Sequence, residues 1–244
     1  MIEGLYSAAS GMEAQQQTLE AISNDLANAD TAGYQSQRIG FEDLLYNGEG
    51  SATAAGVTIG TGTQAVSLGT SQVAGPIEQT GQPLDLAISG DAYFEVKQAD
   101  GSTALTRDGS FQLDAKGQLT TLTGQLVQPP ITVPSGTTAA DLKVSANGDV
   151  VDGAKTLGRI ALVTVPAPEQ LTQAGGNLLL PNAASGAVRA AVGSTVEQGA
   201  LNGSNVSTTL AMTEMMSAQQ GYDLASRAIT MEQQMLQIAN GIKP

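Results

Sequence analysis

Both ends of the chain carry apolar residues at the spacing of an α-helix, in residues 2–29 and in residues 206–242. The first set is Ile2, Leu5, Ala9, Met12, Leu19, Ile22 and Leu26. The second set is Val206, Leu210, Met215, Leu224, Ala228, Met231, Met235, Ile238 and Ile242. From Leu224 the gaps alternate between four and three residues, which is the heptad pattern of a coiled coil. Each end is therefore expected to form a long helix that packs against the other end or against another chain.

The first helix is expected to be weak on its own. Gly4 and Gly11 each cost roughly 1 kcal/mol relative to Ala where they are exposed in a helix interior. Because isolated helices gain most of their stability from packing, we expect this segment to be poorly ordered in the monomer. Gly33 is suited to the left-handed turn that would end it.

Asn24 and Asn28 lie four residues apart, on one face near the end of the first helix. Two interpretations of this pair stay open. The two amides are solvated or cap the last turn, or they form hydrogen bonds to a neighbouring helix and fix its register, as polar residues inside coiled coils do.

The middle of the chain, residues 63–189, changes from helical to β patterning. Polar and apolar residues alternate in residues 93–97, 111–113 and 142–144, and residues 160–165 have the apolar character of a buried strand. Hairpin turns are indicated by Asp100-Gly101, Lys116-Gly117, Asn147-Gly148 and Asp152-Gly153. We therefore predict a largely antiparallel β domain. Residues 47–62, rich in Gly, Ser, Ala and Thr, are predicted to be a flexible or extended connection.

The chain lacks the residue types that much of protein chemistry needs. It has no His, Cys or Trp, which removes the commonest general base and metal ligand, disulfides, and a Trp platform for sugar rings. Its net charge of −13 disfavours nucleic acids and anionic membranes as partners. Its apolar runs are far shorter than the roughly 20 residues that span a bilayer. With no Lys or Arg before Arg38, we expect no secretory signal and no membrane insertion.

The best candidates for catalysis are four carboxylates in one β region, Asp85, Asp91, Glu95 and Asp108. Two of them could cleave a glycosidic bond, but they stand beside turns, where Asp ordinarily serves the turn geometry. Residues 60–62 lack the Lys-Ser/Thr pair of a phosphate loop, and residues 100–108 lack the alternating ligands of a calcium loop. We therefore predict no catalytic, cofactor-binding or metal-binding residues, and no enzymatic activity.

Short motifs follow one another through nearly the whole chain. They include ISNDLANADTAGY in residues 22–34, FEDLLY in residues 41–46, and TRDGSF in residues 106–111. Others are IGTG in residues 59–62, GSNV in residues 203–206, and the pattern of residues 212–236. In this order they resemble the rod and hook proteins of the bacterial flagellum, an axial protein family, and most closely its distal rod members.

The resemblance implies an α+β fold. The terminal helices would pair in a coiled-coil domain made of residues 1–30 and 205–244. A connecting extended or β region would contain residues 31–69 and 190–204, and a β-rich outer domain residues 70–189. We expect the self-assembly interface to include Leu5, Met12, Leu19, Ile22, Asn24, Leu26, Asn28, Leu210, Leu224, Met231, Met235 and Ile238.

The resemblance also implies a function, that of a structural subunit that stacks into a hollow helical tube and transmits torque from the motor to the hook. Such proteins leave the cell through the flagellar type III export apparatus without a cleaved signal peptide, and the rod spans the periplasm. The implied partners are other copies of the chain, adjacent rod and hook proteins, ring bushing proteins and peptidoglycan. No cofactor is implied.

Three departures from the family pattern leave alternatives. Asp25 stands where the family has a second Asn, Gln220-Gly221 stand where it has Arg-Ala, and residues 47–57 are fewer than usual. A proximal-rod or hook paralogue is therefore an alternative to a distal rod subunit. The alternative from another class is a secreted, β-rich protein that binds or cleaves peptidoglycan.

Overall fold

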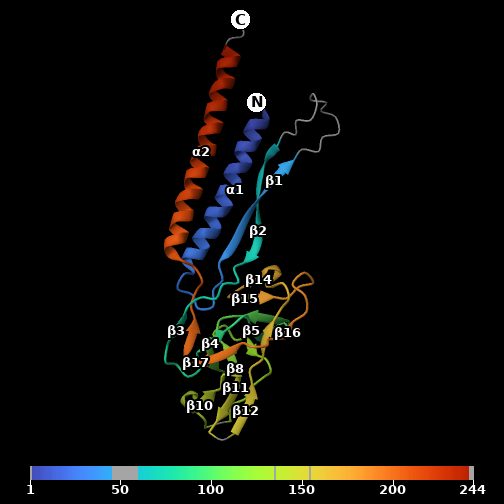
Figure 1. Cartoon of the computed structure of the whole chain (residues 1–244), viewed down its shortest axis with the longest axis vertical. Helices are drawn as coiled ribbons and strands as arrows, with labels where there is room; N and C mark the ends of the chain where they lie inside the picture. Colours follow the sequence, from blue (N-terminus) through green and yellow to red (C-terminus); the bar gives the residue numbers. More distant parts are fainter. Residues whose placement is uncertain (1, 46–59, 135, 154, 242–244) are drawn as a thin grey trace. The chain divides into compact units, whose positions relative to one another are not determined.

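The computed structural model describes residues 2–45, 60–134, 136–153 and 155–241 (Figure 1). It divides into two compact units. The helical unit is drawn from residues 1–27, 37–68 and 207–244, and the β unit from residues 28–36 and 69–206. The predicted α+β class is confirmed, because the terminal helices pack together and the central sheets are mostly antiparallel. The finer division into three regions stays a prediction.

Two long antiparallel helices dominate the helical unit. α1 (Ile2–Ala27) and α2 (Thr208–Gly241) lie side by side and run in opposite directions (Figure 1). The two helices approach each other closely at two glycines. A Cβ atom added to Gly4 would lie 2.8 Å from Glu232 Oε2, and one added to Gly221 would lie 3.0 Å from Gln15 Cδ. Both predicted helices are present, although α1 ends two residues before the expected limit and α2 begins two residues after it. Neither, over its described residues, is long and apolar enough to cross a membrane.

The ends of the helices follow from local sequence. Ser207 precedes α2, and its Oγ accepts the Leu210 N–H at 3.4 Å, which satisfies one of the free N–H groups of a helix start. Beyond Ala27 the chain turns, and Gly33 has a φ of 70°. A Cβ atom at Gly33 would lie 2.4 Å from the backbone nitrogen of Asp108. This position therefore needs glycine both for its conformation and for the close approach.

A two-stranded sheet completes the helical unit. β1 (Gln37–Leu45) pairs with β2 (Gly60–Thr70), and the Thr63 N–H of β2 donates to Ser10 Oγ of α1 at 3.2 Å. The residue pattern alone did not define strand β1, because QRIGFEDLL does not alternate polar and apolar residues, although the family resemblance implied an extended or β region over residues 31–69. Of the connection predicted for residues 47–62, only residues 60–62 are described, and they begin β2. Residues 46–59 lie outside the described residues.

The strands of the β unit are short, and every recorded pairing between them is antiparallel. In the largest sheet, seven strands pair with their neighbours in one series. The order is β14 (Thr172–Gly175), β15 (Leu178–Leu180), β6 (Thr103–Thr106), β5 (Tyr93–Lys97), β9 (Leu126–Val127), β8 (Leu119–Thr121) and β7 (Phe111–Leu113). Two further strands belong to this sheet, because β13 (Leu162–Thr164) pairs with β5 and with β16 (Arg189–Ala190).

Three smaller sheets belong to the same unit. One joins β10 (Leu142–Val144), β11 (Asp149–Asp152) and β12 (Lys155–Arg159). The other two are the pairs β17 (Thr195–Gln198) with β4 (Leu86–Ser89), and β18 (Ala200–Asn202) with β3 (Ile77–Gln79). Short 3-10 helices span Ala139–Asp141 and Pro168–Gln170.

The strand and turn predictions for the middle of the chain are largely confirmed. β5, β7 and β10 have the predicted limits, and the predicted turns connect β5 to β6, β7 to β8, β10 to β11 and β11 to β12. Their glycines, Gly101, Gly117, Gly148 and Gly153, all have positive φ. The strand expected over residues 160–165 is shorter, since only β13 is paired, although Ile160 and Val165 are buried.

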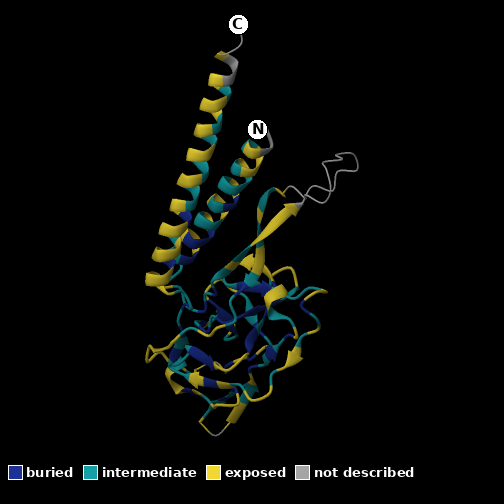
Figure 2. Cartoon of the chain, turned by 45° about the horizontal axis from the view of Figure 1, so that its top comes forward, coloured by how far each residue is buried: buried dark blue, intermediate teal, exposed yellow. Residues whose placement is uncertain are grey.

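The core of the β unit is assembled from aliphatic side chains around two aromatic rings. Phe94 of β5 and Phe111 of β7 meet edge to face, with ring centroids 5.0 Å apart, a favourable arrangement for aromatic pairs. Leu86, Ile88 and Val96 are among the buried side chains of the same cluster. Figure 2 shows this buried material inside the β unit. The β unit therefore has a hydrophobic core of its own.

We predict that Gly11→Ala stabilises α1. An added Cβ atom at Gly11 would have nothing within 4 Å, so the substitution should gain the helix preference of Ala, about 1 kcal/mol, without a clash. Denaturant unfolding of the purified chain, followed by the helical circular dichroism signal, would measure the gain.

Gly33→Ala is the matched control, because the same substitution there meets positive φ and a backbone atom. It should destabilise the chain. A loss of stability in Gly11→Ala would contradict the packing of α1.

Candidate assembly surface on the terminal helices

The contact between α1 and α2 is made mainly by small residues. The buried side chains are Ala14 and Ala21 on α1 and Ala211 and Ala218 on α2, with Ile22 the large exception. The covered positions of α2 are Ala211, Met215, Ala218, Gly221, Tyr222, Ala225, Ser226, Ile229, Glu232 and Leu236. Small side chains let two helix backbones approach closely, but they bury little apolar area. The fully buried small residues therefore allow close packing, while the larger covered residues Met215, Tyr222, Ile229 and Leu236 are only half-buried.

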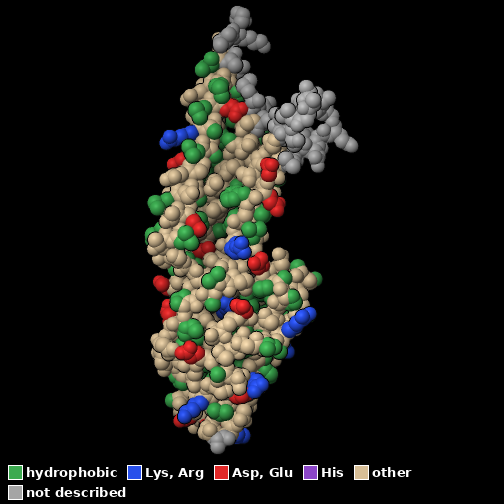
Figure 3. Space-filling view, viewed as in Figure 1, with side chains coloured by type: hydrophobic (Ala, Val, Ile, Leu, Met, Phe, Trp, Pro, Cys, Tyr) green, Lys and Arg blue, Asp and Glu red, His purple; other side chains and the backbone are tan. Residues whose placement is uncertain are grey.

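A second stripe of large apolar residues lies on α2 outside this contact. We call it the outer stripe, and it consists of Leu210, Leu224, Met231, Met235 and Ile238. Their side chains are 57, 67, 58, 56 and 62% exposed. Figure 3 shows hydrophobic side chains at the surface along α2, and Figure 2 shows the exposed side of that helix. The heptad pattern found from Leu224 onward therefore faces outward in the single chain, and α2 packs on α1 through the neighbouring stripe.

The far end of α2 extends beyond α1. α1 has 26 residues and α2 has 34. Because Gly4 lies against Glu232, the helix residues that follow run past the start of α1, as Figure 1 shows. Met235 and Ile238 belong to this overhanging end. The last heptad position, Ile242, lies outside the described residues.

The predicted interface residues of α1 differ in exposure. Ile22 is 7% exposed and is therefore used inside the chain, whereas Leu5, Met12, Leu19 and Leu26 are only half-buried. These four leave part of their apolar surface for a partner.

The two asparagines lie in different surroundings. Asn24 is exposed on α1, and Asn28 follows the helix end, where its Oδ1 accepts the Thr31 hydroxyl at 3.2 Å. The Asn28 carbonyl oxygen also accepts the Thr31 N–H at 3.1 Å. The Asn28 interactions agree with a local turn. Whether the two amides also contact a neighbouring chain stays a prediction.

Exposed large apolar residues of the helical unit outside the predicted set are Tyr6 on α1, Phe41 and Leu44 on β1, Leu68 on β2, and Met212 and Met216 on α2, at 70, 51, 38, 44, 54 and 55%. The sequence could have indicated Phe41 and Leu44, because both belong to the family motif FEDLLY in residues 41–46. They were left out of the predicted interface because only helical spacing was used to select it.

Two departures from the family pattern have local structural roles. Asp25 is 8% exposed, and its Oδ1 accepts the Gln37 N–H at 3.1 Å, which joins the end of α1 to the start of β1. Gly221 is the point at which α2 comes closest to Gln15, so a larger residue would have to displace that side chain. The third departure, in residues 47–57, lies outside the described residues.

The four carboxylates of the β unit do not form a common site. Asp85 accepts the Thr80 hydroxyl at 2.6 Å, Asp108 accepts the Ser110 hydroxyl, and Asp91 is almost fully exposed, 3.9 Å from Arg107. Glu95 lines a separate cleft of about 760 Å³. These carboxylates therefore serve turns and surface contacts, as the turn interpretation predicts.

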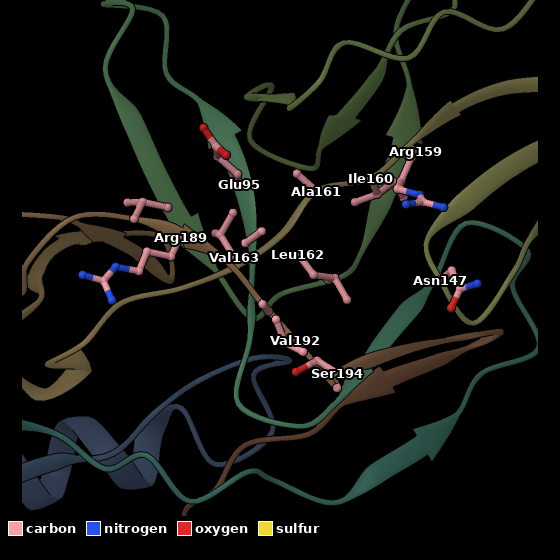
Figure 4. Close-up of a pocket in the computed structure, with 14 residues that line it drawn as sticks. Glu95, Asn147, Arg159, Ile160, Ala161, Leu162, Val163, Arg189, Val192 and Ser194 are labelled. Atoms are coloured by element: carbon pink, nitrogen blue, oxygen red, sulfur yellow. The ribbon is translucent and has the colours of Figure 1, made fainter.

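The cleft beside Glu95 also lacks converging catalytic groups. In Figure 4 the charged ends of Glu95, Arg159 and Arg189 lie apart from one another. Arg159 is paired with Asp149 at 2.6 Å, a bond that lowers the pKa of the Asp149 carboxyl. An acid and a base placed together for hydrolysis are not found among these labelled residues.

Family models match three parts of the chain. Residues 5–35 match "Flagella basal body rod protein", residues 87–151 match "Flagellar hook protein FlgE/F/G D1 domain", and residues 197–242 match "Flagellar basal body rod FlgEFG protein C-terminal". These matches include α1, much of the β unit and α2.

Individual relatives match almost the whole length. The chain is 36% identical to the flagellar basal-body rod protein FlgG of Caulobacter vibrioides, over 99% of this chain and all of the relative. It is also 36% identical to FlgG of Bacillus subtilis, over 97% of both. It is 33% identical to FlgF of Salmonella typhimurium, over 94% of both. The chain therefore belongs to the flagellar basal-body rod family, is FlgG-like, and is a structural component of the rod and not an enzyme.

Proposed function

We propose that the chain builds its part of the rod by burying the outer stripe of α2 against neighbouring copies. The copies stack into a hollow helical tube that carries torque from the motor to the hook. The observation that carries this proposal is the exposure of five large apolar side chains on a helix whose other face is already covered. Large exposed apolar side chains along one face of a helix are typical of a surface that another protein covers.

Burial of the outer stripe would supply free energy for assembly. Its side chains are already one third to almost one half buried. Completing the burial of five such residues is worth on the order of 5 kcal/mol per subunit before the costs of association and ordering. Assembly with neighbours therefore stabilises the helices of each copy.

The exposed surface favours an open assembly. The outer stripe lies on α2, whereas Tyr6 and Phe41 expose different apolar surfaces on α1 and β1. A contact between two unlike faces leaves one face of each kind unused, so copies add in one direction and form a helical polymer. Half-buried Leu5, Met12, Leu19 and Leu26, with Asn24 and Asn28, complete the proposed interface.

The similarity to FlgG supports a distal position in the rod, and the proximal rod and the hook are the alternatives within the family. As further proposals, the partners are adjacent rod and hook proteins, the ring bushings, peptidoglycan and the type III export apparatus. Electron microscopy of assemblies of the purified chain tests the position. A straight, stiff tube is expected, and a curved, flexible tube would indicate a hook subunit.

We predict that Leu224→Asp and Met231→Asp each block polymerisation. Either carboxylate would be desolvated without a partner inside the proposed contact, which costs more than the apolar burial supplies. Because both side chains are exposed in the single chain, the thermal transition of the β unit should not change. Sedimentation and electron microscopy measure assembly, and circular dichroism measures the transition.

Gln219→Asp is the matched control for these substitutions. Gln219 is also exposed on α2 but lies off the outer stripe, so this variant should assemble like the unmodified chain. Normal tubes from Leu224→Asp would refute the role of the outer stripe. A large loss of β-unit stability would instead place the helix in an internal core.

We also predict that the terminal helices order on assembly. Amide hydrogen exchange in α1 and α2 should be fast in the monomer and strongly slowed in the polymer, because the small-residue contact alone stabilises the pair weakly. The amides of β5 and β6 serve as the internal reference, since the core protects them in both states. Equal, strong protection of the helices in the monomer would contradict the prediction.

A further inference from the structure

The chain passes between the helical unit and the β unit four times. The passages follow residues 27, 36, 68 and 206. Any force that one unit transmits to the other along the backbone must go through these four passages. What holds the passages together therefore matters for a protein that carries a mechanical load.

Three of the four passages meet at one side chain in the β unit, that of Asn205. Its Oδ1 accepts the Ser36 N–H at 2.8 Å, and its Nδ2 donates to the carbonyl oxygens of Ser71 at 3.2 Å and Val73 at 2.9 Å. Its backbone N–H donates to the Tyr34 carbonyl oxygen at 3.3 Å. The Ser71 N–H donates to the Ser36 carbonyl oxygen at 2.8 Å, which closes the ring of contacts.

The fourth passage is fixed to the same neighbourhood. The Gly33 N–H donates to the Asn202 carbonyl oxygen at 2.7 Å. The Asn202 side chain is 3% exposed, and it bonds both backbone groups of Ile88 in β4, at 2.7 and 2.9 Å. The segment that follows α1 is thereby tied through β18 to the core of the β unit.

We propose that Asn205 is the positioning residue that locks the β-unit ends of three of these passages into one joint. This inference rests on the proposed function as a torque-carrying subunit. The joint needs asparagine, because one side chain must accept a hydrogen bond and donate two at the same place. Aspartate keeps the shape and the acceptor but loses both donors.

Gln198 provides a matched control inside the β unit. Its amide also connects three segments, because its Nε2 donates to the carbonyl oxygens of Pro83 at 2.7 Å and Leu142 at 2.9 Å, and its Oε1 accepts the Val144 N–H at 3.0 Å. None of these segments is one of the four passages. Gln198→Glu therefore makes the same chemical change without touching the joint.

The test compares Asn205→Asp, Asn205→Ala and Gln198→Glu in the full chain. In purified protein, the Ser36 amide should exchange about tenfold faster in both Asn205 variants, while the amides of Phe94 and Leu105 change by less than about twofold. In cells that lack the native protein, the Asn205 variants should build rods but swim more slowly than cells with the unmodified chain. Gln198→Glu should leave Ser36 exchange and swimming unchanged.

Three results would overturn the proposal. They are unchanged Ser36 exchange in the Asn205 variants, faster exchange with normal swimming, or a lowered thermal transition of the β unit in both variants. The last result would make Asn205 an ordinary folding residue. Failure of the unmodified chain to restore rods would refute the proposed function instead, and Ser36 exchange in the purified chain would still decide whether the joint exists.

Discussion

The close contact of two helices through small residues is the constraint on which the other features of the helical unit depend. Ala14, Ala21, Ala211 and Ala218 bring α1 and α2 close together, while the large side chains of the outer stripe stay exposed. The pair therefore has a defined antiparallel register. The large side chains stay outside, where a second chain can cover them. If leucines filled the contact between α1 and α2, the helical hairpin would be more stable by itself. It would then gain less free energy from assembly.

The β unit is stabilised differently, because it has its own hydrophobic core. Turns and side-chain amides bonded to the backbone also hold it together. Some of its carboxylates, such as Asp85, accept hydrogen bonds from hydroxyl groups at turns, and its amides, such as Asn202 and Gln198, bridge backbone segments. A chain without histidine, cysteine or tryptophan thus builds rigidity from backbone and amide hydrogen bonds. This plan agrees with the structural role of the family.

Much of the fold could be predicted from local sequence, and the choice of interface could not. Positive φ at Gly101 and Gly148 and the limits of β5 follow from turn chemistry and alternation, which act within a few residues. The heptads of α2 were equally clear, but the covered positions, such as Ala218 and Ala225, repeat with the same period as the outer stripe. Periodicity alone does not say which stripe meets α1. The residue pattern did not define β1, because its partner β2 and its contact with α1, and not alternation in its sequence, hold it in place.

The unequal length of the two helices gives the subunit a polarity. At one end α1 and α2 cover each other, and at the other end the last turns of α2 continue alone with Met235 and Ile238 exposed. A single copy cannot satisfy that end by any adjustment of its own. In the proposed assembly another chain fills the space beside it, so each added subunit both covers an unfinished end and presents a new one.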